Sequence, residues 1–297
     1  MFSLSAPRST YFIAIACMVA STASFSLMNI FIRYASEELH TTVIVFFRNF
    51  LSVLFLLPWA LRDGAALVKT TRIGAHFWRA AIGMLGMQSW FYCIATLPLN
   101  HATALSFTAP LFTTLFAVLF LGERADKFRW LALAVGFVGT LIILRPSIAD
   151  TELSSMVVLF ATSMWAIAGM LVKSLTTTEP PLRIVFYMAL FMMLLALPPA
   201  LMHWQWPSPV LWACLACVAI ASTGAHWFLV RAYSIAQVVQ LMPFDFLRLI
   251  FTAIFAYFFF HETSDLFTWL GAGVIIASAV AIARRDAKAA ARASQSA

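Results

Sequence analysis

Apolar segments about twenty residues long recur along almost the whole chain, and the short connections between them carry most of its charge. A helix needs about 20 consecutive apolar residues to cross the hydrocarbon core of a bilayer. The composition agrees, because 63% of the 297 residues are hydrophobic and only 10% are charged, whereas a soluble domain is about 25% charged. The chain is therefore predicted to be an all-α membrane protein, with the lipid bilayer as a partner.

Ten transmembrane helices are predicted from these segments, and the connections are too short to hold a soluble domain. The segments cover residues 10–34, 41–61, 74–97, 101–121, 128–145, 153–175, 182–202, 209–234, 238–260 and 265–284. Lysine and arginine gather before the first segment, in every second connection and in the tail. Because basic residues accumulate in the cytoplasm, both termini are predicted to be cytoplasmic.

The second half of the chain repeats the first. The run that begins at Phe107 can be laid over the run that begins at Phe246. The identical pairs in this overlay include Glu123 with Glu262, Asp126 with Asp265 and Trp130 with Trp269. Similar overlays of earlier segments extend the match, so the chain is interpreted as a duplication of five helices.

An odd number of helices in each copy makes the second copy enter the membrane from the opposite side. Such inverted repeats are typical of secondary transporters, whose substrate site lies near the membrane midplane between the repeats. The predicted domains are residues 1–148, the first five-helix repeat, and residues 149–285, the second and inverted repeat. Residues 286–297 form a basic cytoplasmic tail. We expect a carrier that works by alternating access.

Two motifs carry a resemblance to a known family. Arg48 in the run VFFRNFLSVLF, and Pro110 ahead of Glu123 in APLFTTLFAVLFLGE, resemble the EamA family of the drug/metabolite transporter superfamily. The likeness covers essentially the whole chain, although Leu249 stands where the second repeat would carry its proline. The resemblance implies a multi-pass metabolite exporter of the bacterial inner membrane with a central cavity. Members of the family export amino acids, including aromatic ones, and other small metabolites.

A charge pair interrupts the ninth segment, in the run QLMPFDFLRLIF. Asp245 and Arg248 lie three residues apart, so a helix would place both on one face. Each charge at the centre of a membrane helix costs about 2.5–3.5 kcal/mol, which predicts that this face looks into the bundle. Arg248 could bind the carboxylate and Asp245 the ammonium group of a zwitterion, or the two could form an ion pair that only fixes helix packing.

Polar and aromatic side chains in corresponding segments of the two repeats suggest further substrate contacts. Gln88 and Trp90 lie in the third segment, and His226 and Trp227 lie in the eighth. Rings with a few oriented donors suit a small amphipathic ligand, whereas a buried histidine can equally serve a helix-to-helix hydrogen bond. Three further candidates for substrate contact are Trp165, Tyr92 and Asn29.

Three residues are predicted to have structural or gating roles. Arg48 stands inside the second segment, and Pro110 and Pro243 stand inside the fourth and the ninth. A proline inside a transmembrane helix kinks it and frees backbone carbonyls, so both prolines are plausible hinges.

The sequence favours a secondary transporter that exports amino acids, above all aromatic or hydrophobic ones. An intramembrane enzyme acting on a lipid-linked substrate is the alternative, as is an exporter of nucleosides or drug-like cations. No Walker A or His-Glu-x-x-His motif is present, so no cofactor, metal or catalytic site is expected. The net charge of +7 orients the chain in the membrane, and neither a nucleic-acid partner nor an oligomer is expected.

Overall fold

A computed structural model describes residues 8–62, 69–96, 106, 108–144, 153–260 and 266–295. All regular elements within these residues are helical, which confirms the predicted all-α class. They are α1 (Arg8–Ala35), α2 (Thr41–Arg62), α4 (Ile73–Thr96), α6 (Ala109–Leu121), α7 (Lys127–Leu144), α8 (Leu153–Leu175), α9 (Pro181–Leu201), α10 (Pro209–Ile235), α11 (Val238–Leu241), the 3-10 helix η1 (Met242–Phe244), α12 (Leu247–Phe260) and α13 (Leu266–Gln295).

Six helical stretches of the described chain are long and apolar enough to cross a bilayer, with mean hydropathies from 1.7 to 2.2. They are Thr10–Ala35, Thr41–Pro58, Met156–Leu175, Pro181–Leu201, Pro209–Ile235 and Val238–Phe259. Two shorter apolar helices, Ala109–Leu121 and Trp269–Ile282, accompany them. The protein is therefore a multi-pass membrane protein.

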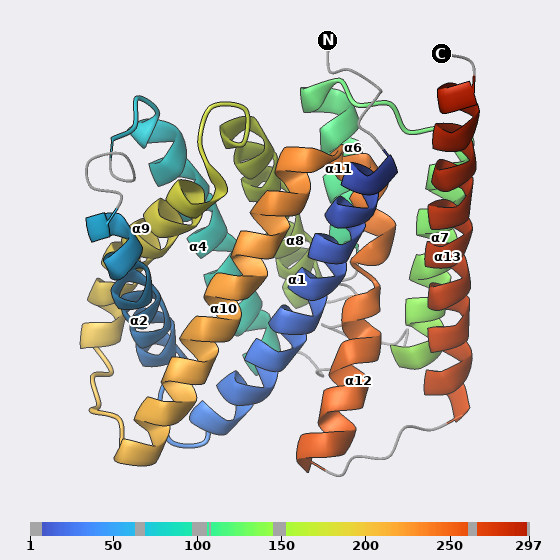
Figure 1. The fold of residues 1–297 in the computed structure, drawn as a ribbon. Helices are drawn as coiled ribbons and strands as arrows, with labels where there is room; N and C mark the ends of the chain where they lie inside the picture. Colours follow the sequence, from blue (N-terminus) through green and yellow to red (C-terminus); the bar gives the residue numbers. More distant parts are fainter. Residues whose placement is uncertain are drawn as a thin grey trace.

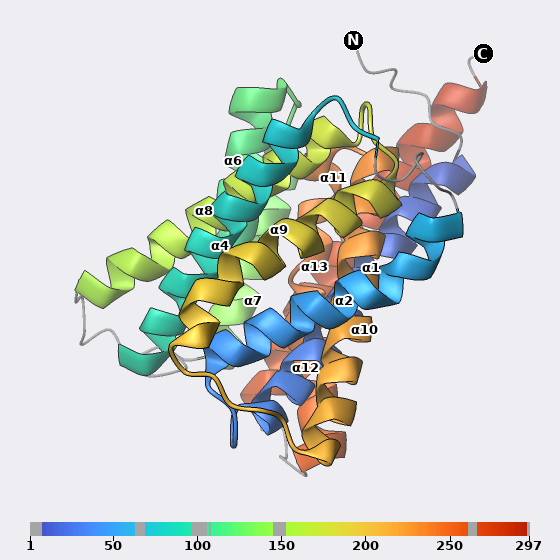
Figure 2. The same ribbon diagram turned by 90° about the vertical axis from the view of Figure 1, so that its left-hand side faces the viewer.

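The helices form one bundle (Figures 1 and 2), and the first helix of each half of the chain packs on a helix of the other half. α1 packs along α10, and α4 packs along α8. α2 packs on α9, while α7 and α13 lie together at one edge of the bundle. α1 begins and α13 ends on the same side (Figure 1).

Connections from both halves meet on each side of the bundle. On one side, Arg72 Nη1 donates to the Ser174 carbonyl at 2.9 Å, and the Thr70 hydroxyl donates to Glu179 at 2.6 Å. These bonds tie the segment before α4 to the α8–α9 connection. On the other side, a stack of the His40 and His203 rings, 3.9 Å between centroids, joins the α1–α2 connection to the α9–α10 connection.

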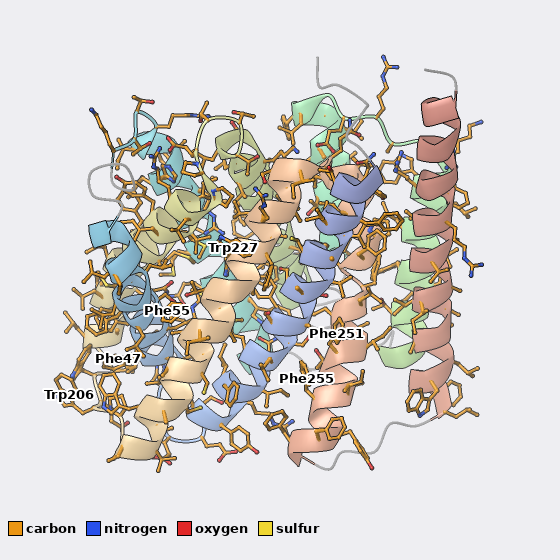
Figure 3. The ribbon with its side chains drawn as sticks, in the orientation of Figure 1. Phe47, Phe55, Trp206, Trp227, Phe251 and Phe255 are labelled. Carbon is orange, nitrogen blue, oxygen red and sulfur yellow. The ribbon has the colours of Figure 1, made fainter. Side chains whose placement is uncertain are left out.

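The aromatic ring of Phe47 extends this second contact. It lies 6.3 Å from the ring of Trp206 and 4.9 Å from that of Trp212 (Figure 3). Large rings from α2, the α9–α10 connection and α10 therefore close this side of the bundle.

The ninth predicted segment, residues 238–260, is not one continuous helix. It consists of α11, η1 and α12, with Pro243 inside η1. Proline has no backbone N–H and disfavours the helical hydrogen-bond pattern around it, which explains why the chain tightens there. Phe246, two residues after the end of η1, is fully buried. Its ring occupies a notch at Gly136, where an added Cβ would lie only 2.7 Å away.

Two other helix boundaries differ from the predicted spans. α13 continues through Arg284 to Gln295, because its Ala-rich sequence has a high helix propensity. α6 begins at Ala109, and Pro110 lies in its first turn, where a missing N–H breaks no helical hydrogen bond. Residues 101–105 of the predicted fourth span lie outside the described residues.

Candidate functional site

The charge pair lies where the backbone enters α12. Arg248 Nη2 donates to Asp245 Oδ1 at 2.6 Å, and the Arg248 guanidinium lies 5.3 Å from the centroid of the Phe25 ring on α1. The hydroxyls of Ser26 and Thr252 both donate to the Arg248 carbonyl, at 2.9 and 2.8 Å. The side chains keep 34% exposure for Arg248 and 14% for Asp245. The pair is thus anchored between α1 and α12 but remains partly accessible.

His226 joins this group from α10. Its Nδ1 lies 2.8 Å from the Ser222 carbonyl, and its ring meets the Phe25 ring edge-on at 4.9 Å. One ring of α1 therefore contacts both the imidazole and the guanidinium of Arg248. The neighbouring Trp227 is 37% exposed and packs on Phe228 (Figure 3).

A second aromatic group lies between α4 and α8. The rings of Trp90 and Trp165 are 5.7 Å apart. Gly86 permits this approach, because a Cβ there would lie 2.8 Å from the Trp165 ring. Gln88 is half-buried on the same helix.

The structure places two of the remaining sequence candidates outside these groups. Asn29 is exposed on α1. Tyr92 belongs to the last part of α4, and its side chain lies outside the described residues.

Sequence overlays relate one residue of each group, Phe25 and Trp165. Laying Phe46 over Phe186 also lays Phe25 over Trp165, and laying Trp90 over Trp227 lays Ser89 over His226. Phe25 with His226 joins α1 to α10, and Trp165 with Trp90 joins α8 to α4.

Sequence reasoning missed Arg79, His76 and Phe25. Arg79 is buried in α4 at 8% exposure, and His76, one turn before it, packs its ring 4.7 Å from the Tyr187 ring. His76 and Arg79 share one face of α4, and Arg72, just before the helix, continues the same spacing. That spacing was a readable signal. Phe25 carried none, since nothing distinguishes one phenylalanine among 28.

Arg48, predicted to be structural or gating, is 6% exposed on α2. Its Nη2 lies 3.5 Å from the Asn49 side-chain oxygen, at the outer limit of a hydrogen bond. It lines a small cavity of about 20 Å³ between α1, α2 and α4, which has room for about one water molecule.

Glu179 is the charged centre of the connection between α8 and α9. It accepts the Thr70 hydroxyl and forms an ion pair with Arg183. Burial alone would raise the pKa of the Glu179 carboxyl, but the hydrogen bonds from Thr70 and Arg183 and the positive charge of Arg183 outweigh it and hold the pKa below its usual value. This carboxylate is therefore ionised at neutral pH, and it joins two connections on one side of the bundle.

An apolar helical bundle with charged and aromatic side chains between its helices defines the protein as a multi-pass membrane protein. The EamA-like transporter family profile matches residues 12–145 and again residues 153–284. The chain belongs to this family, which confirms the resemblance of its motifs and the location in the bacterial inner membrane.

Named relatives indicate what such chains transport. The S-adenosylmethionine uptake transporter of Rickettsia prowazekii is 32% identical over 94% of this chain and 95% of its own. The riboflavin transporter of Brucella anthropi is 31% identical over 91% and 98%. The pseudopaline exporter CntI of Pseudomonas aeruginosa is 28% identical over 90% and 94%.

A solved crystal structure covers 94% of this chain and 99% of its own with a TM-score of 0.77 at 13% identity, which supports the fold. The protein is a metabolite transporter of the drug/metabolite type and not an enzyme.

Proposed function

We propose that this protein is a secondary carrier for a small metabolite with an amino acid group, above all an aromatic one. The observation that carries the proposal is the partly accessible pair of Asp245 and Arg248 beside the rings of Phe25 and His226. A partly buried acid and base offer complementary charges to an ammonium and a carboxylate group. The neighbouring rings offer an apolar surface for a side chain or a base.

The same proposal includes ten spans, arranged as two inverted five-helix repeats with both termini in the cytoplasm. It is supported by the reciprocal packing of α1 on α10 and of α8 on α4, and by the two family matches of similar length. Inverted repeats can expose a central site to either side in turn, by rocking one half against the other. The proposed repeat boundaries are those of the sequence analysis, residues 1–148 and 149–285, and the carrier is proposed to act as a monomer.

The relatives' names agree with part of this substrate class. S-adenosylmethionine carries an amino acid group and an aromatic base, so a relative named for its uptake fits the proposed chemistry. Riboflavin has an aromatic ring system but no amino acid group, so it is the competing substrate class. The direction of net transport is not part of the proposal, because the names include both an uptake transporter and an exporter.

Counterflow in proteoliposomes tests the proposal. Liposomes with purified protein are loaded with unlabelled phenylalanine, S-adenosylmethionine or riboflavin, and the same labelled compound is added outside. The proposal predicts transient accumulation of label for at least one of the two amino acid compounds and none in protein-free liposomes. Accumulation of riboflavin alone, or of no compound, would contradict it.

A matched pair of variants links transport to the site. Asp245→Asn removes the proposed partner of the ammonium group, whereas Asp126→Asn removes a carboxylate that is 41% exposed and paired with Arg285. The first variant is predicted to lose counterflow, and the second is predicted to keep it.

A further inference from the structure

Two buried arginines, Arg48 on α2 and Arg79 on α4, lack the partners that buried cations normally have. The Nε atom of each is buried without a hydrogen-bond partner. Arg79 Nη1 lies 3.7 Å from the Met192 sulfur, which is a weak acceptor. Within the part of the chain that the structure describes, neither guanidinium forms an ion pair with an aspartate or glutamate.

Other cations of the described residues have acceptors for their charge. Arg183 pairs with Glu179, and Arg248 pairs with Asp245. Lys173 Nζ donates to the carbonyls of Tyr233 and Ala236, at 2.6 Å each. Arg48 and Arg79 therefore do not follow the pattern by which this bundle neutralises its charges.

The two arginines also act on one another and on the site already described. Arg79 lies within electrostatic range of Arg48, and His226 lies within range of both and of Arg248. Two like charges in the same low-dielectric interior repel, which adds to the cost of burying each one. Asp245 is already paired with Arg248, so among the described residues neither Arg48 nor Arg79 has a carboxylate of its own.

A small cavity beside Arg48, about 20 Å³ in volume, has room for about one water molecule. Arg48 faces the small cavity lined by Ile32 and Met87, among others. Arg79 packs beside Gly83 of its own helix, where an added Cβ would be in ordinary van der Waals contact with Arg79 Nη1, at 3.7 Å. Guanidinium groups bind carboxylates through two parallel hydrogen bonds, and each of these two has an Nε–H free to donate.

We propose that Arg48 and Arg79 form the subsite for the substrate's carboxylate, with the ammonium group directed toward Asp245. This inference rests on the proposed function and deepens it, because it assigns the carboxylate of the amino acid group to Arg48 and Arg79 and the ammonium group to Asp245. It departs from the structural or gating role that the sequence suggested for Arg48. Among the compounds named above it admits phenylalanine and S-adenosylmethionine and rejects riboflavin, which has no carboxylate.

Ligand-dependent thermal stabilisation of the purified full-length protein in detergent tests the subsite. The probes are phenylalanine, 3-phenylpropionate, which keeps the carboxylate, and 2-phenylethylamine, which lacks it. The carboxylate probes are expected to raise the melting temperature of the wild type through Arg48 and Arg79, whereas any rise with 2-phenylethylamine should be the same in Arg48→Gln and Arg79→Gln as in the wild type. Arg48→Gln and Arg79→Gln should each weaken binding of the carboxylate probes by about 10- to 100-fold, the range for a hydrogen bond to a charged group.

Arg231→Gln is the matched control, because Arg231 is exposed on α10 and its loss removes the same charge. It should leave binding unchanged. Wild-type affinity in Arg48→Gln and Arg79→Gln would overturn the subsite, as would stabilisation by inorganic phosphate without any by the carboxylates.

The melting temperature without ligand separates a binding role from a structural one. Removing a buried charge that has no partner should leave the empty protein equally stable or make it more stable. If Arg48→Gln does not fold, Arg48→Lys keeps the charge but loses the two-pronged hydrogen bonding, and it should bind the carboxylate probes more weakly.

Different experimental results would contradict the proposed subsite and the proposed function. Carboxylate binding that depends on Arg48 and Arg79, without counterflow in the wild type, would refute the carrier proposal and keep the subsite. Wild-type counterflow with unchanged binding in both variants would refute the subsite and keep the carrier.

Discussion

Glu123 and Lys173 bind opposite sides of one break in the backbone, between α10 and α11. The Glu123 carboxylate accepts the N–H groups of Val238 and Val239, at 3.0 and 2.9 Å. Lys173 donates to carbonyls at the end of α10. A carboxylate at a helix N-terminus and a cation at a helix C-terminus both satisfy unpaired backbone groups and complement the helix dipoles. The break that leads into the charged segment is therefore held by side chains from α8 and from the connection after α6.

Glu123→Ala is predicted to destabilise the protein by about 3 kcal/mol, because two buried N–H groups lose their acceptor and each costs about 1–3 kcal/mol. Denaturant unfolding in detergent measures the change. Glu37→Ala, which removes an exposed carboxylate from the α1–α2 connection, is the control and should change stability by less than about 0.5 kcal/mol. Equal stability of the two variants would contradict the role of Glu123.

Gly86→Ala is predicted to separate α4 from α8, since the new Cβ would lie within 2.8 Å of the Trp165 ring and 3.1 Å of the Ala161 carbonyl. Such overpacking costs about 1–3 kcal/mol. Gly224→Ala on α10, where no atom lies within 4 Å, should instead stabilise its helix by about 1 kcal/mol. Thermal unfolding of the two variants side by side gives the comparison, and a stable Gly86→Ala protein would show that the helices do not depend on this contact.

The Glu179 connection predicts a pH dependence of stability. The pKa of the Glu179 carboxyl is lower in the folded protein than its usual value of 4.5. A depressed pKa contributes stability that is complete above the unfolded pKa and is lost as the pH falls through the folded pKa. The melting temperature of the wild type should therefore fall more steeply below about pH 4.5 than that of Glu179→Gln. Parallel pH profiles would rule out this contribution.

Side-specific labelling tests the proposed orientation. In a cysteine-free background, Thr178→Cys lies in the α8–α9 connection and His203→Cys lies just after α9, on the opposite side of the bundle. Because basic residues gather on the Thr178 side, we expect a membrane-impermeant maleimide to label only His203→Cys in intact cells. Exclusive labelling of Thr178→Cys would invert the topology. Labelling at both would contradict separate sides.

The helical bundle was predictable because a bilayer requires apolar segments of fixed length, and Thr41–Arg62 and Leu153–Leu175 lie within a residue of the predicted limits. The pair of Asp245 and Arg248 was also readable, since its partners are three residues apart. Contacts between segments that are distant in the sequence were not predictable. The bonds from Glu123 to Val238, and the meeting of Phe25 with His226, depend on how helices pack, and no local pattern records that packing.

The buried arginines are a second case in which the sequence does not reveal a contact between helices. Arg48 was noticed because it interrupts an apolar segment in its middle, whereas Arg79 lies in the second turn of α4, near the end of a predicted span. Its lack of a carboxylate partner among the described residues is a property of the assembled bundle. A sequence can place a charge in a span, but it cannot say whether a neighbouring helix supplies the counter-charge.

The central claim is that the pair of Asp245 and Arg248 recognises the substrate and does more than fix packing. The most direct measurement is counterflow by the charge-swapped double variant, Asp245→Arg with Arg248→Asp, beside the wild type. The swap keeps an ion pair at the same place but reverses the charges offered to a zwitterion. We predict a folded protein that has lost counterflow of the amino acid substrate. Wild-type counterflow in the swapped protein would contradict the claim and leave the pair a structural role alone.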